Sequence, residues 1–277
     1  GSSDGTLTNG PTWTFNDFTT TLLPTITEVD SLEVNSGVLD LNSNQYLNFD
    51  GSDDYVDITD PSGLGINSDT KGTWTAWIYS EEDNSSEAKI IGFGDANADS
   101  FIYLGITNGL LVAKQKIAGT MKWALDTDAT FDDANKWVHV ALVQDGTEPV
   151  IYVNGVAPAQ AFSTTTDKTE WFNDDAGLDE ARIGCYNKNS GGNTLFFDGK
   201  IRDVRIYQEA LSAEQLKSVY LDRYLPTPKH RFKLDEGTGN GADSGLGSTT
   251  AQTQGVTWTN SNFSIKGSAR IGTNGSI

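Results

Sequence analysis

The sequence predicts an all-β protein, an antiparallel β-sandwich with one short helix towards its C-terminal part. Eight short segments alternate apolar and polar residues with a period of two, which is typical of half-buried strands. Residues that favour turns separate these segments, and only one segment has helical spacing. Hydrophobic residues make up 36% of the 277 residues, which is enough for a packed core.

The predicted strands carry β-branched and aromatic residues, which favour pleated sheets. In chain order they are Tyr46–Phe49, Tyr55–Ile58, Thr73–Tyr79, Lys89–Phe93, Trp137–Val143, Val150–Val153, Ala181–Ile183 and Ile201–Tyr207. Three dipeptides, Asp50-Gly51, Asp145-Gly146 and Asn154-Gly155, are typical of tight turns, because glycine adopts a positive φ at little cost. The last of these predicts a hairpin directly after Val153.

One helix is predicted at Leu211–Tyr220. Ser212 is suited to cap it, with Gln215 three positions further on, and apolar residues recur at helical spacing. Pro226 then marks a linker. We therefore expect a first domain of residues 1–224, followed by a segment of residues 225–277.

Charge and composition exclude several classes of partner. Asp and Glu number 38 against 19 Lys and Arg, a net charge of −19, which repels nucleic acid and anionic lipid alike. No stretch approaches the roughly 18 apolar residues that a membrane span requires, so we expect no membrane insertion. Cys185 is the single cysteine, so no intrachain disulfide can form. The acidic excess has two explanations: a solvated surface, or carboxylates that converge on calcium.

Five segments together resemble the laminin-G-like modules of the concanavalin A-like jelly-roll family, by their order and spacing. They are Tyr46–Ile58, Thr73–Ile78, Lys136–Ala141, Ile151–Gly155 and Phe197–Tyr207, the last followed by Ala210–Ser212. The resemblance covers roughly residues 1–220 and implies a jelly roll of two curved antiparallel sheets packed face to face. It also implies glycan or protein binding in an extracellular, cell-surface or virion setting.

The segment after the linker has two interpretations. Gly255–Phe263 repeats Gly10–Phe18 at five of nine positions, which indicates a second copy of the same fold. His230–Gly239 also resembles the opening strand of family modules, which the first domain lacks at its own start. Residues 225–277 are therefore either the beginning of a second repeat or a strand that completes a module, the chain's own or a neighbour's.

The resemblance also implies a structural calcium ion near the first family strands. Asp50, Asp53 and Asp203 are the candidate ligands, because calcium prefers carboxylate and carbonyl oxygens. The alternative is that Asp50 only shapes its Asp-Gly turn and that Asp203 only pairs with Arg202 or Arg205.

Catalysis is not expected. Glu28–Glu33 fits the E-x-D-x-x-E pattern of laminarinase-like glycoside hydrolases, in which two glutamates flank the glycosidic bond. This match lies ahead of the first family strand instead of within a concave sheet. His139 shares a strand face with Trp137 and Ala141, and we expect it to be a packed residue and not a base.

Loop aromatics beside amide and carboxylate groups are suited to sugars, which present apolar faces and hydroxyl edges. The candidate ligand-binding residues are Trp171, Tyr186, Trp123, Asn187 and Asp174, with packing in the core as the alternative for each. The sequence thus predicts a non-catalytic carbohydrate-binding or adhesion module, whose partner is a glycan or a cell-surface protein. The alternative function is a structural repeat that assembles through tandem domains or through strand exchange by residues 225–277.

Overall fold

The computed structural model describes residues 45–80, 87–129, 135–187, 192–223, 226–236 and 239–259, and the backbone of four short strands outside them. The chain forms two compact units. One comprises Gly1–Asn44 and Asn260–Ile277, and the other comprises Gln45–Thr259. The expected boundary at residue 224 falls inside the second unit.

The described backbone of the first unit forms two antiparallel strand pairs. Strand β1 (Ser31–Val34) pairs with β22 (Ala269–Gly272), and β2 (Val38–Asp40) pairs with β21 (Ser264–Lys266). Glu33 lies in β1 opposite Arg270, but its side chain is outside the described residues, as is the whole of Glu28. Residues 10–18, the first copy of the repeated motif, are also outside them.

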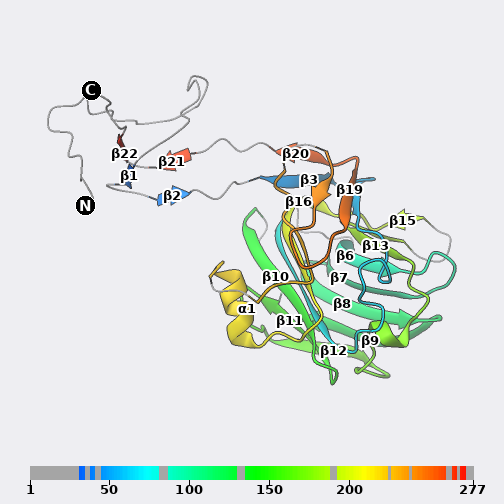
Figure 1. The fold of residues 1–277 in the computed structure, drawn as a ribbon. Helices are drawn as coiled ribbons and strands as arrows, with labels where there is room; N and C mark the ends of the chain where they lie inside the picture. The colour runs from blue at the N-terminus through cyan, green and yellow to red at the C-terminus, as the bar shows by residue number, and fades with distance from the viewer. Residues whose placement is uncertain are drawn as a thin grey trace. The chain divides into compact units, whose positions relative to one another are not determined.

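The second unit is a sandwich of two antiparallel sheets, shown in Figure 1. The seven-stranded sheet contains, in order, β11 (Pro149–Val153), β10 (Trp137–Gln144), β5 (Gly72–Ser80), β16 (Asp198–Tyr207), β3 (Tyr46–Asp50) and β20 (Thr257–Thr259), with β17 (His230–Phe232) paired to β16. The prediction of an all-β antiparallel sandwich is confirmed.

The second sheet has nine strands. They are, in order, β12 (Gln160–Thr165), β9 (Thr120–Thr127), β8 (Leu110–Ile117), β7 (Phe101–Thr107), β6 (Ala88–Gly94), β13 (Glu180–Ile183), β4 (Tyr55–Asp57), β19 (Thr250–Gln254) and β18 (Gly241–Ala242). A small hairpin of β14 (Tyr186–Asn187) and β15 (Asn193–Thr194) and a 3₁₀ turn, η1 (Phe172–Asp174), complete the connections.

The core fills the space between the sheets with side chains from alternate strand positions. Trp74, Ala76 and Ile78 point inward from β5, and Phe93 of β6 lies 4.9 Å from Trp74, ring centre to ring centre. Burying such side chains contributes about 1.5–3 kcal/mol for each large residue. Trp77 and Tyr79, which alternate with these positions, face the opposite side of β5 and are partly exposed.

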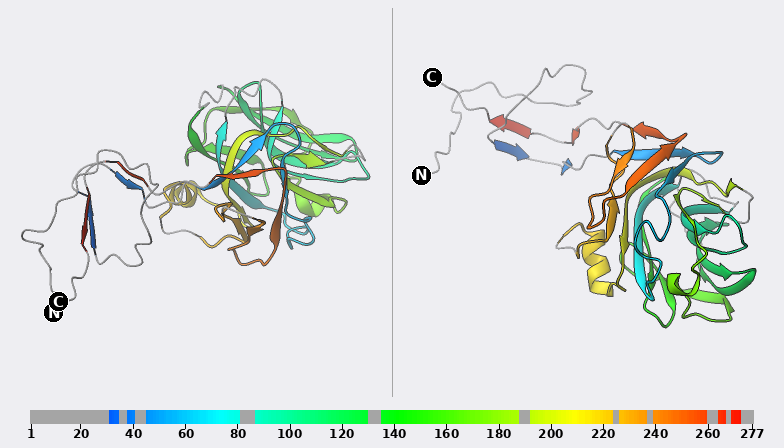
Figure 2. Two further views of the ribbon diagram at one scale, coloured as in Figure 1. Left: turned by 90° about the horizontal axis from the view of Figure 1, so that it is seen from above. Right: turned by 45° about the vertical axis from the view of Figure 1, so that its right-hand side comes forward.

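Helix α1 (Ala213–Tyr220) covers part of the outer face of the seven-stranded sheet, as Figure 2 shows. The Ser212 hydroxyl accepts from the Gln215 N–H, and the Gln215 side chain accepts from the Ser212 N–H, so the predicted capping box is present. Leu216 and Val219 pack on that sheet face. Among the described residues, no helix is long and apolar enough to cross a membrane.

Strands from the segment after the linker pair with the chain's own sheets. Strand β17 adds to β16, β19 adds to β4, and β20 adds to β3. They cover strand edges that would otherwise expose unpaired backbone groups.

Asp203 anchors the first of these pairings. It occupies a β-bulge of β16 with φ +51°, and its backbone N–H donates to Lys233. Its Oδ1 accepts from Nε of Arg205 at 3.0 Å and from Nε of Arg231 at 2.7 Å. Burial alone would raise the pKa of this carboxyl, but hydrogen bonds and charges from Arg205 and Arg231 hold the pKa below its usual value.

His139 is buried on the same sheet, as expected for a packed residue. It is 1% exposed and packs against the rings of Trp77 and Tyr220, at 5.4 and 6.0 Å from ring centre to ring centre. Burial, together with the positive charge of Arg205, lowers the pKa of His139 to about 4. The imidazole is therefore neutral at pH 7.

The Asp203 contacts predict a specific stability loss. Arg231→Met should lower the free energy of unfolding by about 1–2 kcal/mol, because a largely buried carboxylate loses one of its two cations. Urea unfolding followed by circular dichroism measures this. Arg223→Met, at an exposed arginine of the same chain, is the control and should have little effect. Equal effects of the two changes would contradict the anchoring role.

The low pKa of His139 predicts an acid-dependent loss of stability. The folded-state pKa of about 4 lies below the value of roughly 6.5 in an unfolded chain, so the unfolded state takes up a proton first. Stability should fall by up to about 3 kcal/mol between pH 6.5 and pH 4. His139→Gln should remove this component, and comparing the two proteins in urea across this range isolates it from other titrating groups. Parallel pH profiles would rule the effect out.

Candidate functional site

Six partly exposed side chains form a continuous row on the outer face of the seven-stranded sheet. The row consists of four aromatic residues and two cations: Tyr46, Trp77, Tyr79, Trp137, Lys200 and Arg202. They come from β3, β5, β10 and β16. We call this set the aromatic–cation row.

Strand register explains why distant segments meet in this row. Each strand alternates its side chains between the core and the outer face, and cross-strand partners lie on the same face. Trp137 of β10 is paired with Tyr79 of β5, and Tyr79 is paired with Lys200 of β16. Asn48 of β3 is the next partner of Lys200 and adds an amide beside the row.

The rings and cations of the row are in direct contact. The ring of Trp137 lies 5.5 Å from that of Tyr46 and 5.8 Å from that of Tyr79, both edge to face. Lys200 Nζ lies 4.0 Å from the centre of the Tyr79 ring, and the Arg202 guanidinium lies 4.5 Å from the Trp137 ring. Cation–π attraction therefore fixes both cations beside the rings.

This arrangement is suited to a ligand with apolar faces and polar edges. Partly exposed rings offer stacking surface, while the ammonium, guanidinium and amide groups offer hydrogen-bond donors. The sequence contained a signal for it: Trp77, Tyr79 and Trp137 alternate with core residues in two predicted strands. Sequence reasoning missed it because loop aromatics were given priority over strand aromatics.

Two of the candidate ligand residues lie in the core instead. Trp171 is 1% exposed and lies 5.0 Å from the Trp74 ring. Trp123 is fully buried, and its Nε1–H donates to Gln115 at 2.8 Å and to the Glu170 carbonyl at 3.2 Å. Protein atoms enclose both indole rings, so neither offers a face for stacking.

Tyr186 and Asn187 lie together in β14, on the outer face of the nine-stranded sheet. Tyr186 is 4% exposed and packs against Phe101 and Tyr103. The strand approaches β6 so closely that a Cβ on Gly94 would lie 1.6 Å from the Asn187 carbonyl oxygen. Glycine is thus required there for the hairpin to cross the sheet.

Asp174 has a local structural role. It is exposed in η1, and its Oδ2 accepts from the Trp171 N–H at 3.0 Å. The structure therefore groups Asp174 with Trp171, and groups Tyr186 with Asn187. It does not bring the five predicted ligand residues together at one surface.

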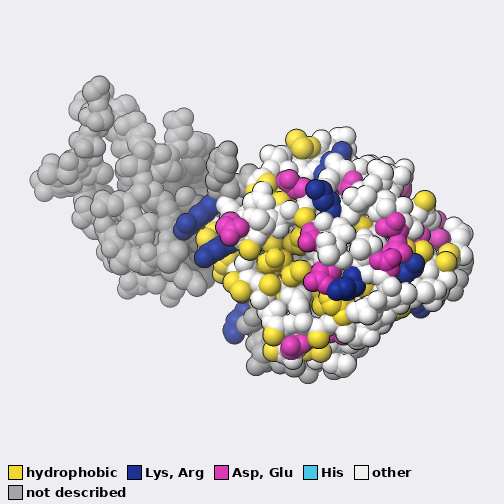
Figure 3. Space-filling model, turned by 90° about the horizontal axis from the view of Figure 1, so that it is seen from below, with side chains coloured by type: hydrophobic (Ala, Val, Ile, Leu, Met, Phe, Trp, Pro, Cys, Tyr) yellow, Lys and Arg dark blue, Asp and Glu magenta, His cyan; other side chains and the backbone are white. Residues whose placement is uncertain are grey.

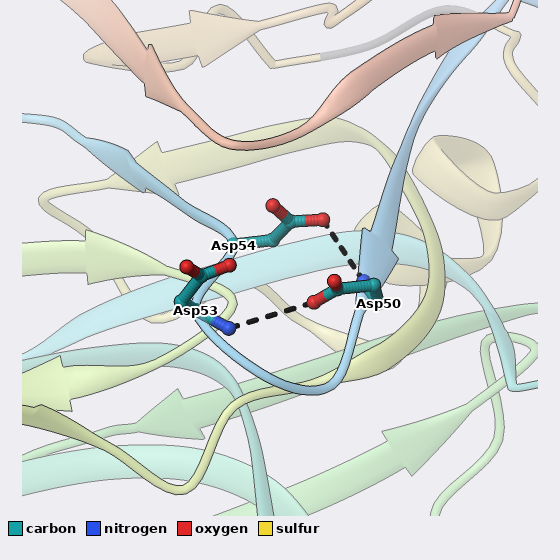
Figure 4. Close-up of side chains that lie close together, drawn as sticks. All are labelled: Asp50, Asp53 and Asp54. Atoms are coloured by element: carbon teal, nitrogen blue, oxygen red, sulfur yellow. Dashed lines mark hydrogen bonds between the residues drawn. The ribbon is translucent and has the colours of Figure 1, made fainter.

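Three carboxylates gather at the turn between β3 and β4, shown in Figure 4. One oxygen from each of Asp50, Asp53 and Asp54 lies within 4.8 Å of the others. Asp50 and Asp53 are two of the three candidate calcium ligands from the sequence, and Asp54 lies beside them. Asp203 does not belong to this group, because Arg205 and Arg231 hold both of its oxygens.

The turn itself places these carboxylates. Asp50 Oδ1 accepts from the Ser52 N–H at 2.8 Å, and Asp54 Oδ2 accepts from the Asp50 N–H at 2.9 Å. Asp54 is 5% exposed, and burial raises its pKa, as do the charges of Asp50 and Asp53. Three clustered carboxylates fit a hard divalent cation, which would relieve their mutual repulsion.

Acidic and basic side chains are mixed on the described surface. On the face drawn in Figure 3, Lys and Arg side chains lie among Asp and Glu side chains and do not form one patch. The overall charge is nevertheless −19. The two cations of the aromatic–cation row are therefore set within a predominantly acidic protein.

Comparisons with known proteins relate the chain to one family. The sequence profile of the concanavalin A-like lectin/glucanases superfamily matches residues 50–217. No curated protein matches the sequence.

Several solved structures share the fold. A candidate carbohydrate-binding protein of Bacteroides ovatus is 22% identical, with a TM-score of 0.56 over 79% of this chain and 60% of its own. The CBM40 module of a Ruminococcus gnavus IT-sialidase, bound to α2,3-sialyllactose, is 19% identical, with a TM-score of 0.54 over 64% of this chain and 97% of its own. A heptameric SAP-like pentraxin of Limulus polyphemus is 17% identical, with a TM-score of 0.53 over 82% of this chain and 99% of its own. This chain therefore spans about three-fifths of the Bacteroides protein.

The cluster of Asp50, Asp53 and Asp54 predicts that Asp54→Asn stabilises the protein without a cation and reduces its stabilisation by calcium. In chelator, Asp54→Asn should raise the melting temperature at pH 7, because the raised pKa of Asp54 makes its charged form costly. The wild-type protein, but not the variant, should lose stability as pH rises through that pKa. Calcium should then stabilise the wild type by about 2.7 kcal/mol at a hundredfold excess over Kd, and the variant by less.

Thermal unfolding with EDTA or calcium tests both effects. Asp145→Asn is the matched control, because Asp145 also accepts backbone N–H groups at an Asp-Gly turn, from Thr147 and Glu148. If calcium raises the melting temperature of the wild type and of Asp54→Asn equally, the three carboxylates are not the cation site.

Proposed function

Since the chain belongs to the concanavalin A-like lectin/glucanase superfamily, we propose that it is a non-catalytic carbohydrate-binding module whose binding surface is the aromatic–cation row. Two structural neighbours support carbohydrate binding as the general function, since one is described as a candidate carbohydrate-binding protein and one is bound to sialyllactose. Their identities of 22% and 19% relate the fold but do not identify a ligand or a surface on this chain.

The row carries the proposal because its rings remain partly exposed after folding. Tyr46, Trp77, Tyr79 and Trp137 all retain solvent contact, whereas Trp123 and Trp171 do not. A sugar ring can stack its apolar face on such rings while its hydroxyl groups meet polar side chains nearby. Asn48 and Arg202 are placed to make those polar contacts.

The composition of the row favours binding without turnover. Glycoside hydrolysis ordinarily requires two carboxyl groups flanking the scissile bond. The six residues of the row include none. The glutamates of the E-x-D-x-x-E pattern belong to the other compact unit.

Three further elements complete the proposal. Calcium is the proposed structural cation, with Asp50, Asp53 and Asp54 as its ligands, because hard oxygen donors converge there. An extracellular, cell-surface or virion location and an adhesive role accord with a glycan partner.

As a second candidate function, strand exchange through β17, β19 and β20 would join copies of the chain, since the same edges could accept these strands from a neighbour.

Substitutions on the two outer sheet faces test the proposed surface. Trp137→Ala and Tyr79→Ala should each weaken glycan binding at least tenfold, about 1.4 kcal/mol, because a stacking ring is lost. A glycan array identifies a bound glycan, and isothermal titration calorimetry gives its Kd. Circular dichroism verifies that the variants fold.

Tyr55→Ala is the matched control. Tyr55 is a partly exposed aromatic residue that contacts Arg182 through its ring, but it lies in β4 of the nine-stranded sheet. Its loss should leave binding unchanged. Binding that depends on Tyr55 but not on Trp137 would move the site to the other sheet, and a folded protein that binds no glycan would refute the function.

A further inference from the structure

We infer that the ligand of the aromatic–cation row is a linear chain of several sugars that lies across the strands, and that β20, after the linker, supplies the polar end of the binding surface. This inference rests on the proposed function, because it names the ligand class of the same surface. Rings of the row stack on consecutive sugars. Asn48, Thr257 and Thr259 exchange hydrogen bonds with the sugar hydroxyl groups at the β20 end.

Three rings of the row follow one another at angles that one sugar cannot match. The ring centres of Tyr79 and Trp137 lie 5.8 Å apart, and those of Trp137 and Tyr46 lie 5.5 Å apart. In each pair the ring planes are inclined by 62°. A rigid sugar ring can lie flat on only one of these planes, whereas a chain can turn at each glycosidic bond. The three rings therefore suit successive sugars of a chain.

The side chains of β20 continue this surface beyond the rings. Trp258 packs against the core between the sheets, so Thr257 and Thr259 on either side of it face outward. Thr257 is exposed and lies opposite Asn48 of β3. Thr259 is partly exposed and lies opposite Tyr46, a ring of the row. Figure 1 shows β20 beside β3, and two hydroxyl groups thus extend the row.

The polar side chains at this end have hydrogen-bonding capacity for a ligand. Within the part of the chain that the structure describes, the side chains of Asn48, Thr257 and Thr259 make no hydrogen bond to another residue. An amide and a hydroxyl can each be both donor and acceptor, as sugar hydroxyl groups are. Cross-strand neighbours lie about 5 Å apart at Cβ, so one sugar can contact two of these groups. Neither end of the surface requires a charged ligand.

The extent of the surface also favours a chain. Its side chains come from five adjacent strands, in the order β10, β5, β16, β3 and β20. At about 4.8 Å for each of the four spacings, the backbones of β10 and β20 lie about 19 Å apart. A sugar ring is comparable in size to one indole ring, so a single sugar cannot contact both the Tyr79 ring and Thr257. A chain that crosses the strands can contact both.

The polar end is a feature of this chain and not of its family. Strand β20 lies outside residues 50–217, which match the superfamily profile, and Tyr46 and Asn48 of β3 precede them. Family membership therefore does not predict the hydroxyl groups of β20. Their place beside the rings follows from the pairing of β20 with β3.

Chain-length dependence tests the inference. Glucose, xylose and mannose oligosaccharides, from disaccharide to hexasaccharide, are titrated against the whole chain by calorimetry, with the same series for any glycan that the array identifies. Wild-type affinity should rise with length. Thr257→Val combined with Thr259→Val keeps the β-branched shape, removes both hydroxyl groups and should weaken hexasaccharide binding about tenfold. The loss should grow with chain length, because only a longer chain contacts both the rings and β20.

Thr250→Val is the matched control. Thr250 is an exposed threonine of the same segment, but it lies in β19 of the nine-stranded sheet. Its change should leave binding of every length unaltered. Melting temperatures and circular dichroism verify that all variants fold alike. Trp137→Ala should weaken binding at every length, because it removes the central ring.

Two results would overturn the inference and leave the proposed function standing. One is a wild-type affinity that does not rise from disaccharide to hexasaccharide. The other is a pair of valine changes that weakens binding of all lengths equally, or of none. In both cases Trp137→Ala would still weaken binding, so the ring surface would remain the site. If no oligosaccharide of any length binds the folded wild type, both the inference and the proposed function fail.

Discussion

Two-sided alternation in β5 is the constraint on which the rest of the sandwich depends. This strand lies between β10 and β16, and its inward residues Trp74, Ala76 and Ile78 are almost completely buried between the sheets. Because the side-chain period of a strand is two, burying these residues forces Trp77 and Tyr79 to the opposite face. A shift of register by one residue would exchange the two sets. The core therefore fixes the outer aromatic surface without any separate interaction to place it.

The bulge at Asp203 adjusts this alternation within β16. One extra residue separates Arg202 from Val204, so that Arg202 points outward while Val204 and Ile206 remain in the core. The buried carboxylate that results is compensated by Arg205 and by Arg231 of β17. The bulge therefore keeps Arg202 in the aromatic–cation row, and its Asp203 also attaches β17 through Arg231. In the sequence, the charged residues around Asp203 indicate only a calcium ligand or a local ion pair, and they do not indicate a bulge.

Sequence alone predicted the fold class and the helix, because alternating segments and the Ser212 cap are local signals. It did not predict β7, β8 and β9 as strands. Strand β7 is buried along almost its whole length, and a strand covered on both faces shows no alternation. The burial of Trp123 was hidden for the same reason, since Trp123 lies in β9. Trp171 directly precedes η1, and its position outside a strand does not tell whether the ring turns inward. The aromatic–cation row required the pairing of strands as distant as residues 46 and 200, which local patterns do not contain.

The row combines packing and recognition in the same side chains, and this sets how variants of it behave. Trp137 contacts Tyr46 although β5 and β16 lie between their strands, so the ring also bridges the sheet surface. Removing it costs packing as well as stacking area, whereas glutamine at position 200 or 202 removes charge and keeps most of the aliphatic stem. Stability and binding are therefore coupled at the rings of this row.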